Sequence, residues 1–251
     1  MSEVEQHTDW DAHWRVEPLD PRAVLAEGRT PRWRGIERIV QERLGGFGGL
    51  RAIELGAGRG LNGLLFARSG ASVTLLDRLE LPLAQARELL AGLGLDAETA
   101  LGDVFELPAE LRGRFDVSMS FGLCEHFLGE RRARFVAAHL EPLRPGGLAL
   151  IGVPNRLAPA YRLWKAVLER RGTWPLGTEE PFGAAELAAL ARRAGGEPLA
   201  PIYGSFAASI VSHGVNQALF KLGRRGLPVP QLHVPLLDRL AYELVLPVVR
   251  R

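Results

Sequence analysis

Cysteine is almost absent from this chain of 251 residues, which contains only Cys124. One thiol excludes an intrachain disulfide and favours a reducing compartment. The start MSEVEQHTDW is acidic and polar, so it lacks the basic and apolar segments of a secretory signal. The longest uncharged stretch, residues 198–220, contains prolines and polar side chains and is not typical of a membrane span. A cytoplasmic protein is predicted.

Lysine is scarce too, and the 31 basic residues are almost all arginine. They alternate with 29 acidic residues, which leaves a formal net charge of +2. This pattern lacks the clustered positive charge that is typical of nucleic-acid binding. The densest basic run, residues 131–134, is expected on the solvated face of a helix, and His139 is expected at the same surface.

Apolar residues, in contrast, are plentiful at 47%, which is enough for one large buried core. Between residues 50 and 154, short apolar segments that suit strands alternate with segments of helical spacing. The strand-like segments are 50–55, 71–77, 97–104, 115–122 and 146–154. Such alternation is typical of parallel β-α-β units. It predicts an α/β fold: a Rossmann-like, doubly wound, mostly parallel sheet with helices on both faces.

The same pattern divides the chain into three parts. Residues 1–45 are expected to form an N-terminal arm and helix, and residues 46–204 the sheet domain, with an insertion at 155–182. Residues 205–251 form a C-terminal extension, expected as a helical appendage because Leu236, Leu240 and Leu244 repeat at helical spacing between Pro235 and Pro247. Packing of this helix on its own domain is preferred over a dimer contact or a peripheral membrane contact.

The stretch IELGAGRGLNG, residues 53–63, carries two overlapping glycine patterns at the end of the first strand. Gly58, Gly60 and Gly63 match the G-x-G-x-x-G loop that seats a dinucleotide pyrophosphate. Glu54 followed by Gly56, Gly58 and Gly60 matches the acidic loop of S-adenosylmethionine sites. A carboxylate at position 54 suits a cationic amino-acid group and opposes a pyrophosphate.

Two further acidic residues follow strands. Asp77 closes the second strand, where its oxygens can accept hydrogen bonds from both ribose hydroxyls of any adenosine cofactor. The alternative for Asp77 is a helix N-cap. Asp103 follows the third strand, where its carboxylate can accept from an adenine amino group while the Val104 N–H serves a ring nitrogen. The two positions predict a nucleoside site.

These motifs, with FDVSMSFGLCEHF (115–127) and LRPGGLALIGVPN (143–155), resemble the class I S-adenosylmethionine-dependent methyltransferases. The resemblance is to the small-molecule branch of the ubiquinone-biosynthesis type (methyltransferase type 11). It covers residues 45–195 and rests on five ordered motifs. It implies S-adenosyl-L-methionine as the cofactor and a small molecule as the acceptor. The fourth strand ends in SMSFG instead of the Asn/Asp-Pro-Pro-aromatic signature of nucleobase methyltransferases, so no nucleic-acid partner is expected.

The resemblance also implies roles for single residues. The arm with WDAHW, residues 10–14, would fold over the pocket as a lid. Because the sheet domain itself would bind only the cofactor, we expect the arm, the insertion at 155–182 and the tail to set acceptor specificity. The implied cofactor-binding residues are Glu54, Gly56 and Gly58 at the methionine end, Gly60 in the same loop, Asp77 at the ribose, Asp103 and Val104 at the adenine, and Phe121 between cofactor and acceptor.

Glu125 and His126 are the catalytic candidates. Quinone-biosynthesis relatives have a Glu-x-x-Glu-His pattern here that is associated with a divalent metal, but Gly122 replaces the first Glu, so no metal is expected. A neutral imidazole at position 126 suits a general base near pH 7. The alternative is that the pair caps and packs the helix that follows the strand.

The sequence therefore predicts methyl transfer from S-adenosylmethionine to a small apolar or aromatic acceptor, with oxygen preferred over carbon as the accepting atom. Two alternatives stay open: an NAD-dependent oxidoreductase built on Gly58, Gly60 and Gly63, and a non-catalytic S-adenosylmethionine-binding or scaffold protein. The oligomeric state also stays open. Four tryptophans are expected either to wall the acceptor pocket or to anchor the arm and the insertion: Trp10, Trp14, Trp164 and Trp174.

Overall fold

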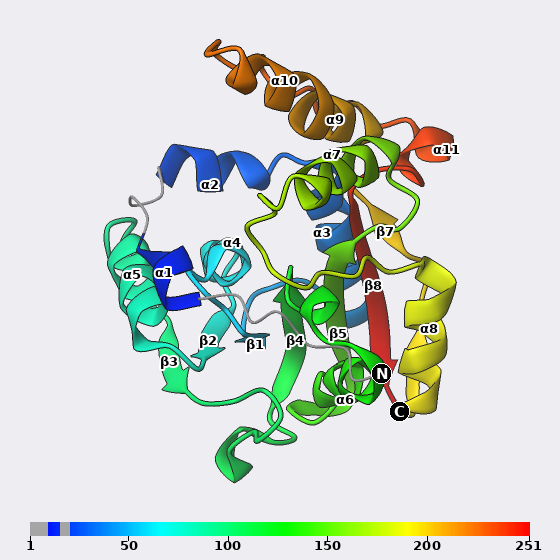
Figure 1. Cartoon of the computed structure of the whole chain (residues 1–251). Helices are drawn as coiled ribbons and strands as arrows, with labels where there is room; N and C mark the ends of the chain where they lie inside the picture. The colour runs from blue at the N-terminus through cyan, green and yellow to red at the C-terminus, as the bar shows by residue number, and fades with distance from the viewer. Residues whose placement is uncertain (1–9, 16–20) are drawn as a thin grey trace.

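Eight strands form one mixed sheet in the described part of the chain, residues 10–15 and 21–251 of a computed structural model (Figure 1). The strand order is β3-β2-β1-β4-β5-β8-β6, and β7 also pairs with β8. The strands from β1 to β5 are parallel, whereas β5, β6 and β7 run antiparallel to β8. The strands are β1 (Arg51–Leu55), β2 (Ser72–Asp77), β3 (Glu98–Leu101), β4 (Phe115–Phe121), β5 (Leu143–Pro154), β6 (Gly196–Pro198), β7 (Ile202–Tyr203) and β8 (Glu243–Arg250).

Helices cover both faces of this sheet (Figure 1). One face packs against α3 (Pro31–Leu44), α4 (Leu61–Arg68) and α5 (Glu80–Ala91), and the other against α6 (Gly129–Ala138) and α8 (Ala184–Arg193). Alternate residues of β5 separate the two cores: Leu148 and Leu150 join the first, Ala149 and Ile151 the second. This period of two is the pattern of a strand buried on both faces. The predicted Rossmann-like α/β fold is confirmed.

The remaining helices lie near the N-terminus and in the part of the chain after β5. Near the N-terminus are α1 (Trp10–Trp14) and α2 (Pro21–Glu27). The helices α7 (Pro159–Arg170), α9 (Phe206–Ile210), α10 (Asn216–Lys221) and α11 (Pro235–Asp238) gather at the top of Figure 1, with a π-helical turn, η3 (Val211–Val215), between α9 and α10. In the described residues no helix is long and apolar enough to cross a membrane.

The expected helix over residues 235–247 is wrong. Only its first turn is helical, as α11, and the chain then enters β8, which pairs with β5 from Glu243 to Val249. The reason is burial on both faces: Val245 contributes to one core, while Leu244 and Val248 contribute to the other. The leucines repeat at a spacing that also fits a helix, whereas the β-branched residues of the tail favour a strand that is buried on both faces.

The expected solvent exposure of the arginine-rich helix is wrong at two positions. Arg132 is buried, because its guanidinium lies 3.3 Å from the centroid of the Phe182 ring and its Nε pairs with Glu186 at 3.1 Å. His139 is fully buried between the Phe135 carbonyl and the Ser120 hydroxyl. Both side chains connect α6 to its neighbours.

Candidate active site

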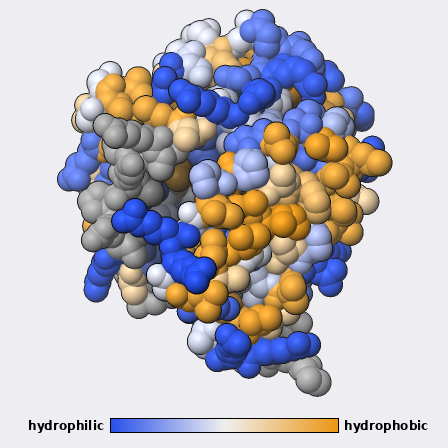
Figure 2. All heavy atoms as spheres, turned by 90° about the horizontal axis from the view of Figure 1, so that it is seen from above, coloured by the Kyte–Doolittle hydropathy of each residue, from blue (hydrophilic) through white to orange (hydrophobic). Residues whose placement is uncertain are grey.

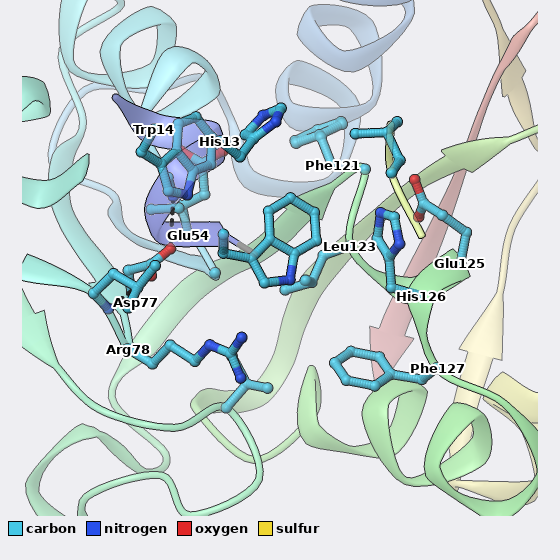
Figure 3. Close-up of a pocket in the computed structure, with 18 of the residues that line it drawn as sticks. His13, Trp14, Glu54, Asp77, Arg78, Phe121, Leu123, Glu125, His126 and Phe127 are labelled. Atoms are coloured by element: carbon cyan, nitrogen blue, oxygen red, sulfur yellow. Dashed lines mark hydrogen bonds between the residues drawn. The ribbon is translucent and has the colours of Figure 1, made fainter. Parts of the chain in front are cut away.

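A cavity of about 550 Å³ opens at the carboxyl ends of the parallel strands, where open α/β sheets bind their ligands. Figure 3 shows two groups of side chains facing each other across it. Glu54 and Asp77 lie on one side, at the ends of β1 and β2, and Glu125, His126 and Phe127 lie on the other, after β4. The cavity therefore has a side made by the strands and the glycine loop and a second side made by the segment after β4.

The glycine loop joins β1 to α4 and forms the floor beneath α1. Gly58 has φ 52°, and a Cβ there would lie 2.6 Å from the Trp14 ring. Only glycine combines this backbone conformation with so close an approach. Gly56 and Gly58 line the cavity, whereas Gly60 lies at the N-terminus of α4, outside the lining.

Glu54 is buried beneath the start of α4. One carboxylate oxygen accepts from the Gly63 N–H at 2.8 Å and the other from the Asn62 side chain at 3.3 Å. Asn62 in turn accepts from the buried Arg32 at 2.9 Å. Burial is the largest effect on this group and raises the pKa of Glu54 to about 7, against the opposing hydrogen bonds. A cationic group placed beside Glu54 would favour the charged form of this carboxyl group.

The Glu54 carboxylate bears on the choice between the two glycine patterns. In a dinucleotide site the pyrophosphate lies at the helix N-terminus, and the third glycine of the loop allows close packing of the helix on the sheet. Gly63 has this packing role here, because a Cβ would lie 2.5 Å from Leu75. The acidic Glu54 beneath the start of α4, bonded to the Gly63 N–H at 2.8 Å, opposes a pyrophosphate there and disfavours the dinucleotide alternative.

Asp77 ties the end of β2 to the glycine loop. Its carboxylate accepts from the Gly58 N–H at 2.8 Å and from the Leu79 N–H at 3.0 Å. Burial raises the pKa of Asp77, and these backbone hydrogen bonds oppose that shift. Asp103 and Val104 lie farther along the same side of the cavity, and Asp103 accepts from the Phe105 N–H at 2.8 Å. Phe121 lies between the two sides, with its ring packed on Gly152.

Helix α1 covers the cavity. The backbone carbonyl of Trp14 accepts from Gln85 at 3.1 Å, and the Arg59 guanidinium lies 5.8 Å from the Trp14 ring. The Trp10 ring meets His126 edge to face at 5.0 Å, so α1 reaches both sides. Trp10, His13 and Trp14 all line the cavity. Trp164 and Trp174 instead pack against each other at 5.0 Å, outside the cavity lining.

His126 lies in the 3₁₀ turn η2 (Cys124–His126) with its ring fixed by one hydrogen bond. Nδ1 is 2.9 Å from the Thr178 carbonyl oxygen. Because a carbonyl only accepts, Nδ1 carries the proton and Nε2 keeps a free lone pair. Burial, with smaller contributions from His13 and Lys165, lowers the pKa of His126. The imidazole is therefore neutral near pH 7 and can take up a proton at Nε2.

Glu125 is also buried and lines the cavity beside His126. Its Oε2 has no hydrogen-bond partner among the described residues. Burial, and then the charge of Glu179, raises the pKa of Glu125 to about 8. Glu179 accepts a hydrogen bond from the Tyr161 hydroxyl, and its own pKa is raised by burial. Near pH 7 Glu125 is mostly protonated and can donate a hydrogen bond.

Several lining residues escaped the sequence motifs, among them Thr178, Glu179 and Tyr242. Thr178 and Glu179 come from the loop after α7, and Tyr242 directly precedes β8. The insertion boundary at 155–182 encloses the first two, but no local pattern distinguishes them from loop residues. Among the described residues no group of three or more His, Cys, Asp or Glu side chains could hold a metal ion.

Comparison with known proteins gives concordant matches. Residues 52–147 match the family model of a methyltransferase domain. A ubiquinone biosynthesis O-methyltransferase from Ruegeria pomeroyi is 30% identical over 204 residues, 76% of this chain and 77% of that protein. Its counterpart from Azotobacter vinelandii is 31% identical over 157 residues, and the chain spans 62% of its length.

A solved structure shares the fold. The magnesium protoporphyrin IX methyltransferase of Synechocystis, crystallised with S-adenosylhomocysteine, has a TM-score of 0.62 at 13% identity and covers 96% of this chain and 93% of its own. The fold and the site thus define a Rossmann-like methyltransferase. The chain belongs to the class I S-adenosylmethionine-dependent methyltransferases of small molecules, with S-adenosyl-L-methionine as the cofactor. The comparisons give no support to the oxidoreductase or the scaffold alternative.

Proposed function

We propose that the chain transfers the methyl group of S-adenosylmethionine to a hydroxyl oxygen of a small aromatic acceptor, with His126 as the general base. The observation that carries the proposal is the oriented, neutral imidazole: Nδ1 is bound to the Thr178 carbonyl and Nε2 is free to accept a proton. Both curated relatives named above are O-methyltransferases by name, which supports oxygen as the accepting atom.

The residues of the first side fit the cofactor. A Cβ at Gly58 would lie 2.6 Å from the Trp14 ring, so only glycine lets α1 lie this close over the loop that lines the cavity. Glu54 matches the cationic amino group, while Asp77 and Asp103 offer carboxylate oxygens to hydroxyl and amino donors. When bound, S-adenosylmethionine supplies an electrophilic methyl group on a cationic sulfur. The protein residues bind and orient the reactants and exclude water.

The second side fits a flat acceptor. Trp10 and Phe127 provide aromatic walls, and Glu125 with its unpartnered oxygen can hold an acceptor oxygen by donating a hydrogen bond. As the O–CH₃ bond forms and the S–CH₃ bond breaks, the hydroxyl proton passes to Nε2 of His126. The cytoplasmic location stays a prediction, and the oligomeric state stays open.

The test is methyl transfer from labelled S-adenosylmethionine to a panel of phenols and catechols. His126→Ala should lower kcat by about 10²- to 10⁴-fold, while affinity for S-adenosylhomocysteine, measured by calorimetry, stays within about threefold. The exposed His233→Ala is the matched control and should keep wild-type kcat. An unchanged kcat in His126→Ala would refute the general base, and methylation confined to carbon or nitrogen acceptors would refute the oxygen assignment.

A further inference from the structure

The exposed apolar side chains of this protein are concentrated in one short segment. Among the described residues, nine of the thirteen exposed large apolar side chains lie between positions 215 and 237. Leu236 is 76% exposed and Leu222 71%. Figure 2, which looks down on α9 to α11, shows apolar residues gathered across the middle of this face. Concentrated exposure of this kind marks an interaction site. We call this segment the apolar surface.

The backbone of the apolar surface is held in place. The buried Asn216 accepts from the Leu227 N–H at 2.6 Å and donates to the Leu227 carbonyl at 3.0 Å. Ser205 donates to the Leu232 carbonyl at 2.7 Å. Between α10 and α11 the chain has no regular structure, yet these bonds fix it at two points. The leucines therefore point outward from a fixed backbone.

The charges on the same segment are of one sign. Lys221, Arg224 and Arg225 are exposed within it, and Arg239 is exposed two residues after its end. The only acidic residue between positions 206 and 242 is Asp238, which is buried and accepts from the N–H groups of Phe206 and Val234. The segment thus presents apolar side chains and positive charge to its surroundings, with no exposed carboxylate.

We infer that the apolar surface docks on a lipid bilayer that contains anionic headgroups. Apolar side chains flanked by arginine and lysine insert at the boundary of headgroups and acyl chains, and the cations pair with the lipid phosphates. A symmetric contact between two copies fits less well, because it would place two sets of unbalanced positive charge against each other. The docking needs neither cofactor nor turnover, so it stands apart from the proposed function.

Docking on a membrane would also affect how the acceptor reaches the cavity. Helix α7 packs against α9 and η3 and, through Tyr161, binds Glu179 of the cavity lining. The elements that lead into the apolar surface, α9 and η3, are therefore connected through α7 to the second side of the cavity. An acceptor dissolved in the membrane would be captured there. This consequence rests on the proposed function, whereas the docking itself does not.

The experiment is flotation of the full chain with vesicles of phosphatidylcholine, alone or mixed with phosphatidylglycerol. The wild type should bind the mixed vesicles on the order of tenfold more than the neutral ones, and salt should reduce that binding. Leu232→Glu combined with Leu236→Glu should lose this binding. Leu101→Glu is the matched control, because Leu101 is 61% exposed on β3 and Leu232 60% on the apolar surface. Arg224→Glu with Arg225→Glu should weaken binding to the mixed vesicles only.

Three results would overturn the inference: no vesicle binding by the wild type, equal binding to both vesicle types, or a dimer in light scattering that the leucine variants dissociate. The last would assign the surface to a second copy. Titration of each variant with S-adenosylhomocysteine reports whether the fold and the cofactor site are intact. If binding to vesicles fails while phenols are methylated, only the docking is wrong, and the reverse result would refute only the proposed function.

Discussion

At the scale of single residues, Asp77 joins the glycine loop to the second strand through the hydrogen bond from the Gly58 N–H. Replacing Asp77 by Ala removes this acceptor and the carboxylate offered to the ribose. Hydrogen bonds to charged groups contribute roughly 1.5–3 kcal/mol, so affinity for S-adenosylhomocysteine should fall about 10- to 100-fold in calorimetric titration. Asp96→Ala, an exposed aspartate after α5, should bind like the wild type. Unchanged affinity in Asp77→Ala would contradict the ribose role.

Residues near a glycine loop or a strand end could be predicted from the sequence, because topology brings the ends of parallel strands together. Glu54, Asp77 and Asp103 were found in this way, and the structure places all three around one cavity. Thr178 and Tyr242 could not be found, since only the fold brings them to His126 and Glu125. The roles of these residues toward the cofactor and the acceptor stay predictions.

At the scale of secondary-structure elements, the leucine spacing predicts a helix where the structure has strand β8. Pairing with β5, which is distant in sequence, makes this segment a strand. Leu246 lies opposite Ile151 and is 1% exposed, whereas Leu236, ten residues earlier, is 76% exposed. Leu246→Ala should lower the free energy of unfolding by roughly 2–5 kcal/mol, because it leaves a cavity between β8 and the helices that cover it. Leu236→Ala should change it by less than about 0.5 kcal/mol. Urea denaturation of both variants measures the difference, and equal effects would argue against the strand.

The elements that the sequence did predict share one property. The strands β1, β2, β4 and β5 are apolar runs bounded by glycine, proline or polar turns, so their period and length identify them locally. Arg132 and His139 show the limit of this reasoning. Their polar character suggested solvent, but an aromatic ring, a glutamate and a serine hydroxyl from other elements satisfy them inside the fold.

At the scale of the whole molecule, buried ionisable groups set how stability depends on pH. Glu54 and Glu125 have pKa values raised to about 7 and about 8 from a reference of 4.5, so the folded state holds protons that the unfolded state has released. His139 has its pKa lowered to about 4, so below pH 6.5 the unfolded state holds the additional proton. As the pH rises toward 6.5, the carboxyl groups therefore lower the free energy of unfolding while His139 raises it. Above pH 6.5 only the carboxyl groups change it.

The free energy of unfolding should consequently decrease between pH 6.5 and pH 8. From pH 6.5, Glu54 lowers the free energy of unfolding up to its folded pKa of about 7, and Glu125 up to its folded pKa of about 8. These intervals of about half a pH unit and about one and a half pH units together amount to roughly 2–3 kcal/mol. Glu125→Gln cannot ionise, so most of the decrease between pH 7 and pH 8 should disappear in that variant. The exposed Glu130→Gln controls for the lost charge and should follow the wild type. Urea denaturation at a series of pH values measures these slopes. A wild-type stability that does not decrease from pH 6.5 to pH 8 would mean that Glu125 is already ionised in the folded protein at pH 6.5, and it could then not donate a hydrogen bond to the acceptor.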